Sequence, residues 1–160
     1  WIVNEKISKI SINDLLSKDL KVLILDVDGT LISGNNPVLS KDIKNWVFNS
    51  KKHFDIYLFS NNPSKKRIKL IADQLDLKFT HSGGKPRKKK LNKLIDKFPY
   101  STSEIAIIGD RIFTDILVGN RLGMHTILVD SVDYYGNKIE KNNLQSIERF
   151  LAKIITGEFS

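Results

Sequence analysis

Hydrophobic residues occur along the chain in short runs separated by stretches of mixed polarity. The clearest run covers residues 22–25, four consecutive valine, leucine or isoleucine residues, and is typical of a strand buried on both faces. Comparable runs predict four more strands, at residues 55–60, 77–81, 105–109 and 125–129. Their short length favours strands over buried helices.

Between these runs, apolar residues recur at i, i+3, i+4 and i+7, which is the spacing of one helix face. Ser40 is expected to cap a helix that carries Ile43, Trp46 and Val47 on its apolar face, so Trp46 is predicted to belong to the core. Further helices are predicted from Pro63 after an Asn62 cap, from about Pro86, over residues 114–122 and over residues 144–154.

Strands that alternate with helices form βαβ units, which place strands in parallel and helices on both faces of the sheet. The sequence therefore predicts an α/β fold of three layers, Rossmann-like, around a five-stranded parallel sheet. Its 160 residues suffice for one domain. We expect a lead-in over residues 1–20 with a short helical turn capped by Ser11, a core over residues 21–130, and a C-terminal loop and helix over residues 131–160.

Composition excludes several classes of site. The chain has no cysteine, which rules out disulfides, thiolate zinc sites and cysteine nucleophiles and fits a reducing compartment. The three histidines, His53, His81 and His125, lack the spacing of metal ligands. No apolar run approaches the roughly 20 residues that span a bilayer, and no secretory signal opens the chain, so we expect a cytoplasmic protein.

The net charge of +8 predicts an anionic partner: nucleic acid, lipid headgroups or phosphorylated metabolites. Basic residues concentrate in two runs, from Lys65 to Lys69 and from Lys85 to Lys93. The second run lacks interleaved aromatic residues, so nucleic acid is not expected. Two interpretations stay open. The runs are solvated helix faces, or they dock on an anionic membrane, where each basic residue adds about 1 kcal/mol.

Polar residues follow the predicted strands where their carboxyl ends should meet in one crevice. They are Asp26 and Asp28 after the first strand, Ser60 and Asn61 after the second, Lys85 after the third, and Asp110 and Asp115 after the fourth. Clustered carboxylates form a hard oxygen site that suits Mg²⁺. A lysine offers a point charge for phosphate, and a hydroxyl and an amide near a helix start offer it hydrogen bonds. Together these groups indicate metal-assisted phosphoryl transfer.

Four segments in chain order resemble the motifs of the haloacid dehalogenase (HAD) superfamily: DVDGTL at Asp26, SNN at Ser60, KP at Lys85 and GDRIFTD at Gly109. The longer stretch GDRIFTDILVGNRLGMHTILV, together with SNNPSKKR, KPRKKK and the lead-in, is similar to the YqeG-type phosphatases of HAD subfamily IIIA. This likeness covers nearly the whole chain. One departure is Gly29, where many members have asparagine; it leaves the implied mechanism intact.

The resemblance implies a phosphoaspartyl mechanism. Asp26 would be the nucleophile, and Asp28 would protonate the leaving oxygen and then activate water. Ser60 and Asn61 would hold the phosphoryl oxygens, and Lys85 would neutralise them and orient Asp26.

The resemblance also implies a Mg²⁺ site. Its ligands would be the carboxylate of Asp26, the backbone carbonyl of Asp28, and Asp110, with Asp115 in support through water or Lys85. Thr30 would brace the phosphate-binding loop through its hydroxyl.

Cap domains of this superfamily are inserted between the first and second motifs or between the second and third. Here residues 26–60 and 60–85 each leave room for one helical crossover, so no cap domain is expected. An open site would suit a bulky substrate, a phosphate presented at a surface, or a cap lent by a neighbouring subunit.

Some YqeG-type relatives dephosphorylate phosphatidylglycerophosphate to phosphatidylglycerol. The leading hypothesis is therefore that reaction at a membrane surface, on an anionic phospholipid headgroup, by a protein peripheral on the inner face. A soluble phosphosugar or nucleotide is the alternative substrate. A non-catalytic phosphate- or RNA-binding module on the same fold is a second alternative, which the intact Asp26, Asp28, Lys85 and Asp110 argue against.

Overall fold

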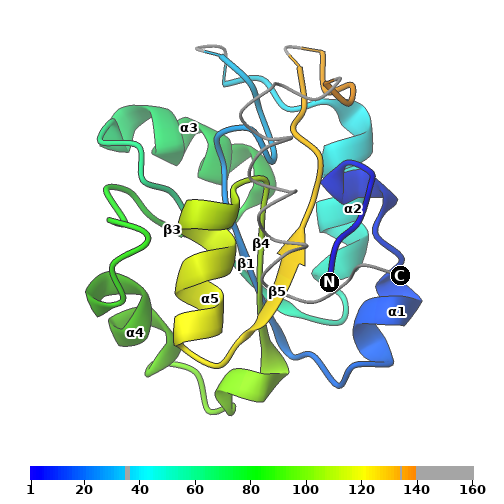
Figure 1. Cartoon of the computed structure of the whole chain (residues 1–160). Coiled ribbons are helices and arrows are strands. Elements are labelled where there is room, and N and C mark those ends of the chain that lie inside the picture. The colour runs from blue at the N-terminus through cyan, green and yellow to red at the C-terminus, as the bar shows by residue number, and fades with distance from the viewer. Residues whose placement is uncertain (35–36, 134, 140–160) are drawn as a thin grey trace.

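Five parallel strands form one sheet in the computed structural model, which describes residues 1–34, 37–133 and 135–139 (Figure 1). The strands are β1 (Val22–Leu25), β2 (Asp55–Phe59), β3 (Lys78–Thr80), β4 (Ile105–Gly109) and β5 (His125–Leu128). Their order across the sheet is β3-β2-β1-β4-β5. The chain runs outward from β1 to one edge and then returns to β4 beside β1. The topological switch point therefore lies between β1 and β4, and the predicted parallel α/β sheet is confirmed.

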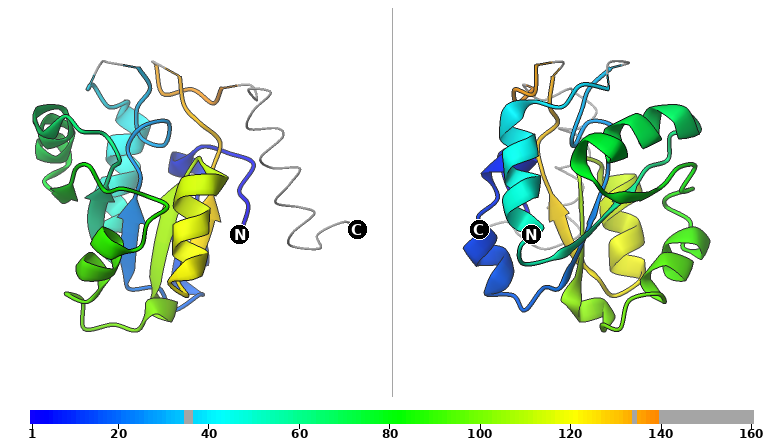
Figure 2. Two further views of the ribbon diagram at one scale, coloured as in Figure 1. Left: turned by 60° about the vertical axis from the view of Figure 1, so that its left-hand side comes forward. Right: turned by 180° about the vertical axis from the view of Figure 1, so that it is seen from behind.

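Helices cover both faces of the sheet, as predicted (Figure 2). One face carries α1 (Ile12–Leu16), α2 (Lys41–Ser50) and α3 (Lys65–Leu75), and the other carries α4 (Lys89–Ile95) and α5 (Leu117–Arg121). Short helical turns lie at Ile7–Lys9, Thr102–Glu104 and, as a π-helix termed η3, Ile112–Ile116. Side chains of a strand alternate between faces. Leu23 and Leu25 accordingly pack into the first layer, and Val22 and Ile24 into the second.

Two helices begin later than the sequence pattern predicts. Helix α3 begins at Lys65, and its cap is Ser64, whose hydroxyl accepts the backbone N–H of Arg67 at 3.3 Å. The predicted cap Asn62 instead accepts the N–H of Ser64 at 2.9 Å, which closes a turn ahead of the helix. Helix α4 begins at Lys89 rather than near Pro86.

The turn before α4 explains its late start, because the N–H of Arg87 donates to the carbonyl of Gly84 at 2.9 Å. The predicted helix over residues 114–122 begins as the π-helix η3 and continues as α5. The predicted helix over residues 144–154 lies outside the described residues. Ser40 precedes α2 as predicted, but its hydroxyl donates to Asp42 and does not cap the helix.

The lead-in packs against the sheet. The hydroxyl of Ser11 accepts the N–H of Asp14 at 3.2 Å, which confirms the predicted cap. The N–H of Val3 donates to Leu128 at 2.8 Å, so the first residues lie along the edge of β5. Trp46 is buried, and its indole N–H donates to the carbonyl of Ile10 at 2.9 Å, as expected of a core residue.

The crossovers on either side of β2 are short. Between β1 and β2 the described residues contain loops and α2, and between β2 and β3 they contain α3; neither crossover contains a further domain among the residues described. No helix in the described part of the chain is long and apolar enough to cross a membrane.

Candidate active site

Three aspartates meet at the switch point of the sheet. Asp26 directly follows β1, Asp110 directly follows β4, and Asp115 lies in η3. All three are buried, and one carboxylate oxygen of each lies within 4.8 Å of the others. They approach because β1 and β4 are paired in register, with Leu25 opposite Ile108. We call these three residues the aspartate cluster.

Lys85 enters the aspartate cluster from the loop after β3. Its side chain is 1% exposed, and its ammonium donates to Asp26 at 2.6 Å, to the carbonyl of Phe59 at 3.0 Å, and to Asp115. The predicted contacts of Lys85 with the two aspartates are therefore present. The amide of Asn61 fixes the backbone of Lys85, donating to its carbonyl at 2.9 Å and accepting its N–H at 2.8 Å.

The electrostatics of the cluster favour a cation. Burial, followed by the charge of Asp115, raises the pKa of Asp26 from 3.8 to about 7, although Lys85 opposes the shift. Burial also raises the pKa values of Asp110 and Asp115. Burial alone would lower the pKa of Lys85, but the charges of Asp26 and Asp115 outweigh it and raise that pKa. One lysine therefore does not fully offset three carboxylates.

Two hydroxyl groups hold Asp110. Ser131 donates to one of its oxygens at 2.7 Å and Thr30 donates to the other at 3.3 Å. Gly29 lies against the same carboxylate in the left-handed region, with φ of +90°, and a Cβ there would lie 2.3 Å from Asp110 Oδ2. A side chain at position 29 would therefore require Asp110 to move. Gly29 is thus a close neighbour of the aspartate cluster.

Asp28 lies outside the aspartate cluster and has its own partners. Its carboxylate accepts the hydroxyl of Ser60 at 3.2 Å and the guanidinium of Arg67. The second terminal nitrogen of Arg67 donates to the carbonyl of Gly34 at 2.6 Å. The sequence pattern placed Arg67 in the basic run from Lys65 to Lys69, which was interpreted either as a solvated helix face or as a surface that docks on an anionic membrane; the guanidinium is instead paired with Asp28. A usable signal was its place in the first turn of a helix that starts at the carboxyl edge of the sheet.

A pocket of about 240 Å³ opens beside Asp26 and Asp28. Its other lining residues are Asn61, Asn62, Lys85, Arg111 and Thr114. Ser60 and Thr30 are buried and do not line it; their hydroxyls donate to Asp28 and Asp110. Their roles toward phosphate, and that of Asn61, stay predictions. We call this cavity the catalytic pocket.

A second pocket, of about 280 Å³, shares Asp28 and Arg111 with the catalytic pocket. Gly34, Ser131 and Ile139 contribute to its walls, so we call it the loop pocket. Sequence reasoning missed Arg111, Thr114 and Ser131. Ser131 follows β5 at the same sheet edge, so the strand-end rule that found the aspartates applied to it as well.

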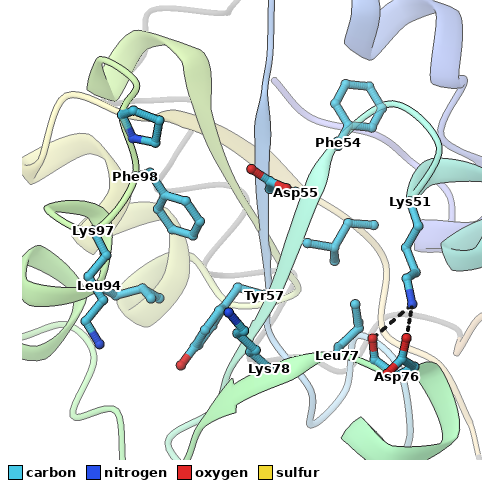
Figure 3. A pocket seen from close by; sticks show the side chains of 12 residues that line it. Lys51, Phe54, Asp55, Tyr57, Asp76, Leu77, Lys78, Leu94, Lys97 and Phe98 are labelled. Atoms are coloured by element: carbon cyan, nitrogen blue, oxygen red, sulfur yellow. Dashed lines mark hydrogen bonds and ion pairs between the residues drawn. The ribbon is translucent and has the colours of Figure 1, made fainter.

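A larger pocket, of about 500 Å³, lies at the starts of β2 and β3, away from the aspartate cluster (Figure 3). Tyr57, Leu94 and Phe98 contribute apolar surface, and Lys51 pairs with Asp76 at its margin at 3.1 Å. It holds no metal-binding group of acidic side chains among the described residues.

Comparison with known proteins identifies the family. A family model described as HAD-hydrolase-like matches residues 82–146. The chain is 31% identical to the probable phosphatase YqeG of Bacillus subtilis, over 88% of this chain and 81% of that protein. The chain belongs to the YqeG-type phosphatases of the HAD superfamily. The resemblance of its four motifs is thereby confirmed.

Two further relatives of this YqeG-type phosphatase have more specific names. The mitochondrial phosphatidylglycerophosphatase GEP4 of Saccharomyces cerevisiae is 26% identical over 87% of this chain and 82% of that protein. The chloroplastic/mitochondrial phosphatidylglycerophosphate phosphatase 1 of Arabidopsis thaliana is 24% identical over 87% of this chain, which spans 44% of that protein. A crystal structure of an uncharacterized Listeria monocytogenes protein shares the fold, with a TM-score of 0.60 and 19% identity over 78% of this chain and 84% of that chain.

Proposed function

We propose that this phosphatase hydrolyses phosphatidylglycerophosphate to phosphatidylglycerol through a phosphoaspartyl intermediate on Asp26. The observation that carries the chemistry is the buried Asp26 carboxylate at the catalytic pocket, oriented by Lys85 at 2.6 Å. The names of the yeast and plant relatives support the substrate. The absence of a cap among the described residues of the two crossovers supports a substrate whose bulk stays outside the pocket.

The reaction would proceed in two displacements. In the first, an oxygen of Asp26 forms a bond to phosphorus while the bond from phosphorus to the ester oxygen breaks, and Asp28 gives that oxygen its proton. In the second, Asp28 takes a proton from water as the water oxygen attacks phosphorus. The bond to Asp26 then breaks and inorganic phosphate leaves. Lys85 stabilises the carboxylate charge of Asp26 before the attack and again when phosphate leaves.

The aspartate cluster fits a hard divalent cation, which we propose to be Mg²⁺. Its donors are carboxylate oxygens, and their raised pKa values indicate a lack of compensating positive charge. Asp26, Asp110 and the backbone carbonyl of Asp28 would hold the ion, with Asp115 in support. When bound, Mg²⁺ would neutralise charge on the phosphoryl group.

We propose that the enzyme meets its substrate as a peripheral protein on the inner face of a membrane. Arg87, Lys88, Lys89 and Lys90 are exposed and follow directly after Lys85 and Pro86, close to the catalytic pocket. Lys65 and Lys66 are exposed at the start of α3. These side chains are available to pair with anionic phospholipid headgroups.

The test is phosphate release from a panel of substrates, with Mg²⁺ and with a chelator. Phosphatidylglycerophosphate, presented both as a short-chain monomer and in vesicles, should be turned over fastest and only with the metal. Preference for a phosphosugar or nucleotide would show that the lipid is not the substrate, although the protein would still be a phosphatase. Phosphate binding without turnover of any compound would contradict the proposed catalytic activity.

A further inference from the structure

Three large exposed apolar side chains lie on segments that follow the carboxyl ends of strands, two on loops and one on η3. They are Val38, Phe113 and Tyr135, which are 62%, 45% and 77% exposed and follow β1, β4 and β5. The other exposed large apolar residues of the described chain are Trp1, Leu16, Phe48 and Leu70, which lie at the N-terminus and on α1, α2 and α3. Single exposed apolar residues need no explanation, but a group around one site does.

Each of the three belongs to a chain segment that also supplies residues to one of the two pockets. Phe113 stands between Arg111 and Thr114, which line the catalytic pocket. Val38 and Tyr135 belong to the loops that supply Gly34 and Ile139 to the loop pocket.

Those two loops lie against each other. The N–H of Val132 donates to the carbonyl of Gly29 at 2.9 Å, and a Cβ on Gly136 would lie 2.6 Å from Ser40 Oγ. Figures 1 and 2 show both loops together beyond the carboxyl ends of the strands. The segments that carry Val38, Phe113 and Tyr135 therefore lie at the same end of the sheet as the two pockets.

Positive charge accompanies these three side chains. Arg111 is exposed and lines both pockets, and Arg87 and Lys88 are exposed on the loop that carries Lys85. Aromatic side chains beside basic residues are the composition of surfaces that enter the interface of an anionic membrane. We call these apolar and basic side chains together the rim. The rim is complementary to an anionic bilayer in both polarity and charge.

We propose that Val38, Phe113 and Tyr135 insert into the headgroup region of an anionic membrane and hold the catalytic pocket at the depth of the lipid phosphates. This inference rests on the proposed function, because it assumes a lipid substrate. Phe113 is the central contact, since its neighbours line the catalytic pocket. The basic residues bring the protein to the surface, and the three apolar side chains fix its orientation there.

The test is cosedimentation with vesicles of phosphatidylcholine and phosphatidylglycerol, at low salt and at about 0.5 M salt, where the Debye length is only about 4 Å. Binding that survives high salt reports on the apolar contact. Phe113→Ala should weaken that residual binding about tenfold, because it removes a large apolar ring, part of which is already covered in the free protein. Tyr135→Ser should weaken it severalfold.

The matched control is Phe48→Ala, which removes an even more exposed phenylalanine, 67% exposed on α2. It should bind vesicles like the unchanged protein. Equal binding by Phe113→Ala and Phe48→Ala would overturn the proposal. If thermal unfolding shows that Phe113→Ala does not fold, the vesicle binding of Tyr135→Ser is compared with that of Phe48→Ala instead, and equal binding by these two variants would overturn the proposal. Sedimentation without lipid provides a further check, because an oligomer that Phe113→Ala dissociates would assign the rim to a second copy of the chain.

The outcomes separate this inference from the function on which it rests. Hydrolysis of short-chain monomeric phosphatidylglycerophosphate tests the substrate without a membrane. If that hydrolysis occurs but high-salt vesicle binding does not depend on Phe113 or Tyr135, the inference alone fails. If binding depends on both residues but the lipid is not hydrolysed, the substrate assignment fails and the membrane contact stands.

Discussion

Arg67 donates to the carboxylate of Asp28 although 39 residues separate the two in the sequence. The same guanidinium donates to the carbonyl of Gly34 at 2.6 Å, so one side chain connects α3, the loop after β1 and the group that we assign as the general acid. The side chain of Arg67 is 14% exposed and that of Asp28 is 39% exposed. This pair fixes where the carboxyl group of Asp28 lies at the catalytic pocket.

Replacement of Arg67 should therefore impair catalysis. We expect Arg67→Ala to lower kcat/KM for a soluble phosphate ester about 10- to 100-fold, because a hydrogen bond to a charged group contributes about 1.5–3 kcal/mol. Arg67→Lys should give an intermediate value, since one ammonium cannot reproduce the two-point contact of a guanidinium. Lys66→Ala, on the same helix but exposed, is the control and should retain the original kcat/KM. An unchanged kcat/KM in Arg67→Ala would remove the residue from the active site.

Asp26→Asn should abolish the nucleophile. The amide keeps the size of the side chain but lacks the attacking charge, so turnover should fall at least about 10³-fold. Beryllium fluoride should bind as a phosphate mimic to the original protein and not to the variant, as measured by fluorine NMR. Near-normal turnover in Asp26→Asn would exclude the phosphoaspartyl mechanism.

Asp110→Ala should weaken metal binding without lowering the stability of the metal-free protein. Removal of one of three buried carboxylates relieves repulsion, since burial and Asp26 raise the pKa of Asp110 in the absence of a cation. Thermal unfolding across a Mg²⁺ titration measures both effects. Equal stabilisation of the two proteins by Mg²⁺ would show that Asp110 is not a ligand.

Metal-free protein should lose stability as the pH rises from about 4 to about 7. Burial and the charge of Asp115 raise the pKa of Asp26 from 3.8 to about 7, so in this range the folded state retains a proton that the unfolded state releases. The free energy of unfolding therefore falls with rising pH, by at most about 1.4 kcal/mol per pH unit for this group. Urea unfolding with a chelator at several pH values measures the slope.

Two comparisons identify the source of that slope. Asp26→Asn should flatten it, because the neutral amide does not titrate. Saturating Mg²⁺ should also flatten it, since the cation takes the place of the proton. A slope that is unchanged in both experiments would assign the pH dependence to other groups.

Conversion of Arg87, Lys88, Lys89 and Lys90 to glutamine should weaken binding to anionic vesicles by up to about 4 kcal/mol at low salt, because each basic residue near the surface contributes about 1 kcal/mol. Vesicle cosedimentation measures this loss. Turnover of a soluble ester should survive, since Lys85 alone of this run contacts Asp26 in the described structure. The matched control converts the exposed residues Lys9, Lys18, Lys41 and Lys52, which changes the net charge equally elsewhere. A parallel loss of vesicle binding and of soluble-ester turnover would instead indicate that these four residues act in catalysis or stabilise the fold.

The hydrophobic pattern predicted the parallel sheet, because burial of a strand on both faces leaves a continuous apolar run such as residues 22–25. It also predicted which residues meet, since parallel strands must present Asp26 and Asp110 at one edge. The residues at which helices begin were harder to predict from the sequence. Apolar periodicity marks a helix face but not the turns that precede it, so the turn that delays α4 to Lys89 was not visible.

Contacts made by long side chains were the least predictable part of the site. Arg67 and Lys66 are neighbours of the same charge, yet one is turned toward Asp28 and the other is exposed. Only the rotation of α3 relative to the sheet distinguishes them, and charge patterning carries no such information. Asn61 was expected at phosphate, and its amide is engaged with the backbone of Lys85.

The bonds of Lys85 have a consequence for the order of folding. They join it to Asp26 across 59 residues and to Asp115 across 30, and Thr30 meets Asp110 across 80. Contacts of such high sequence separation require the entropy of loop closure to be overcome first, which makes them slow to form. The site cannot assemble from one local segment of the chain. Recovery of turnover during refolding should therefore mark the completion of the whole sheet.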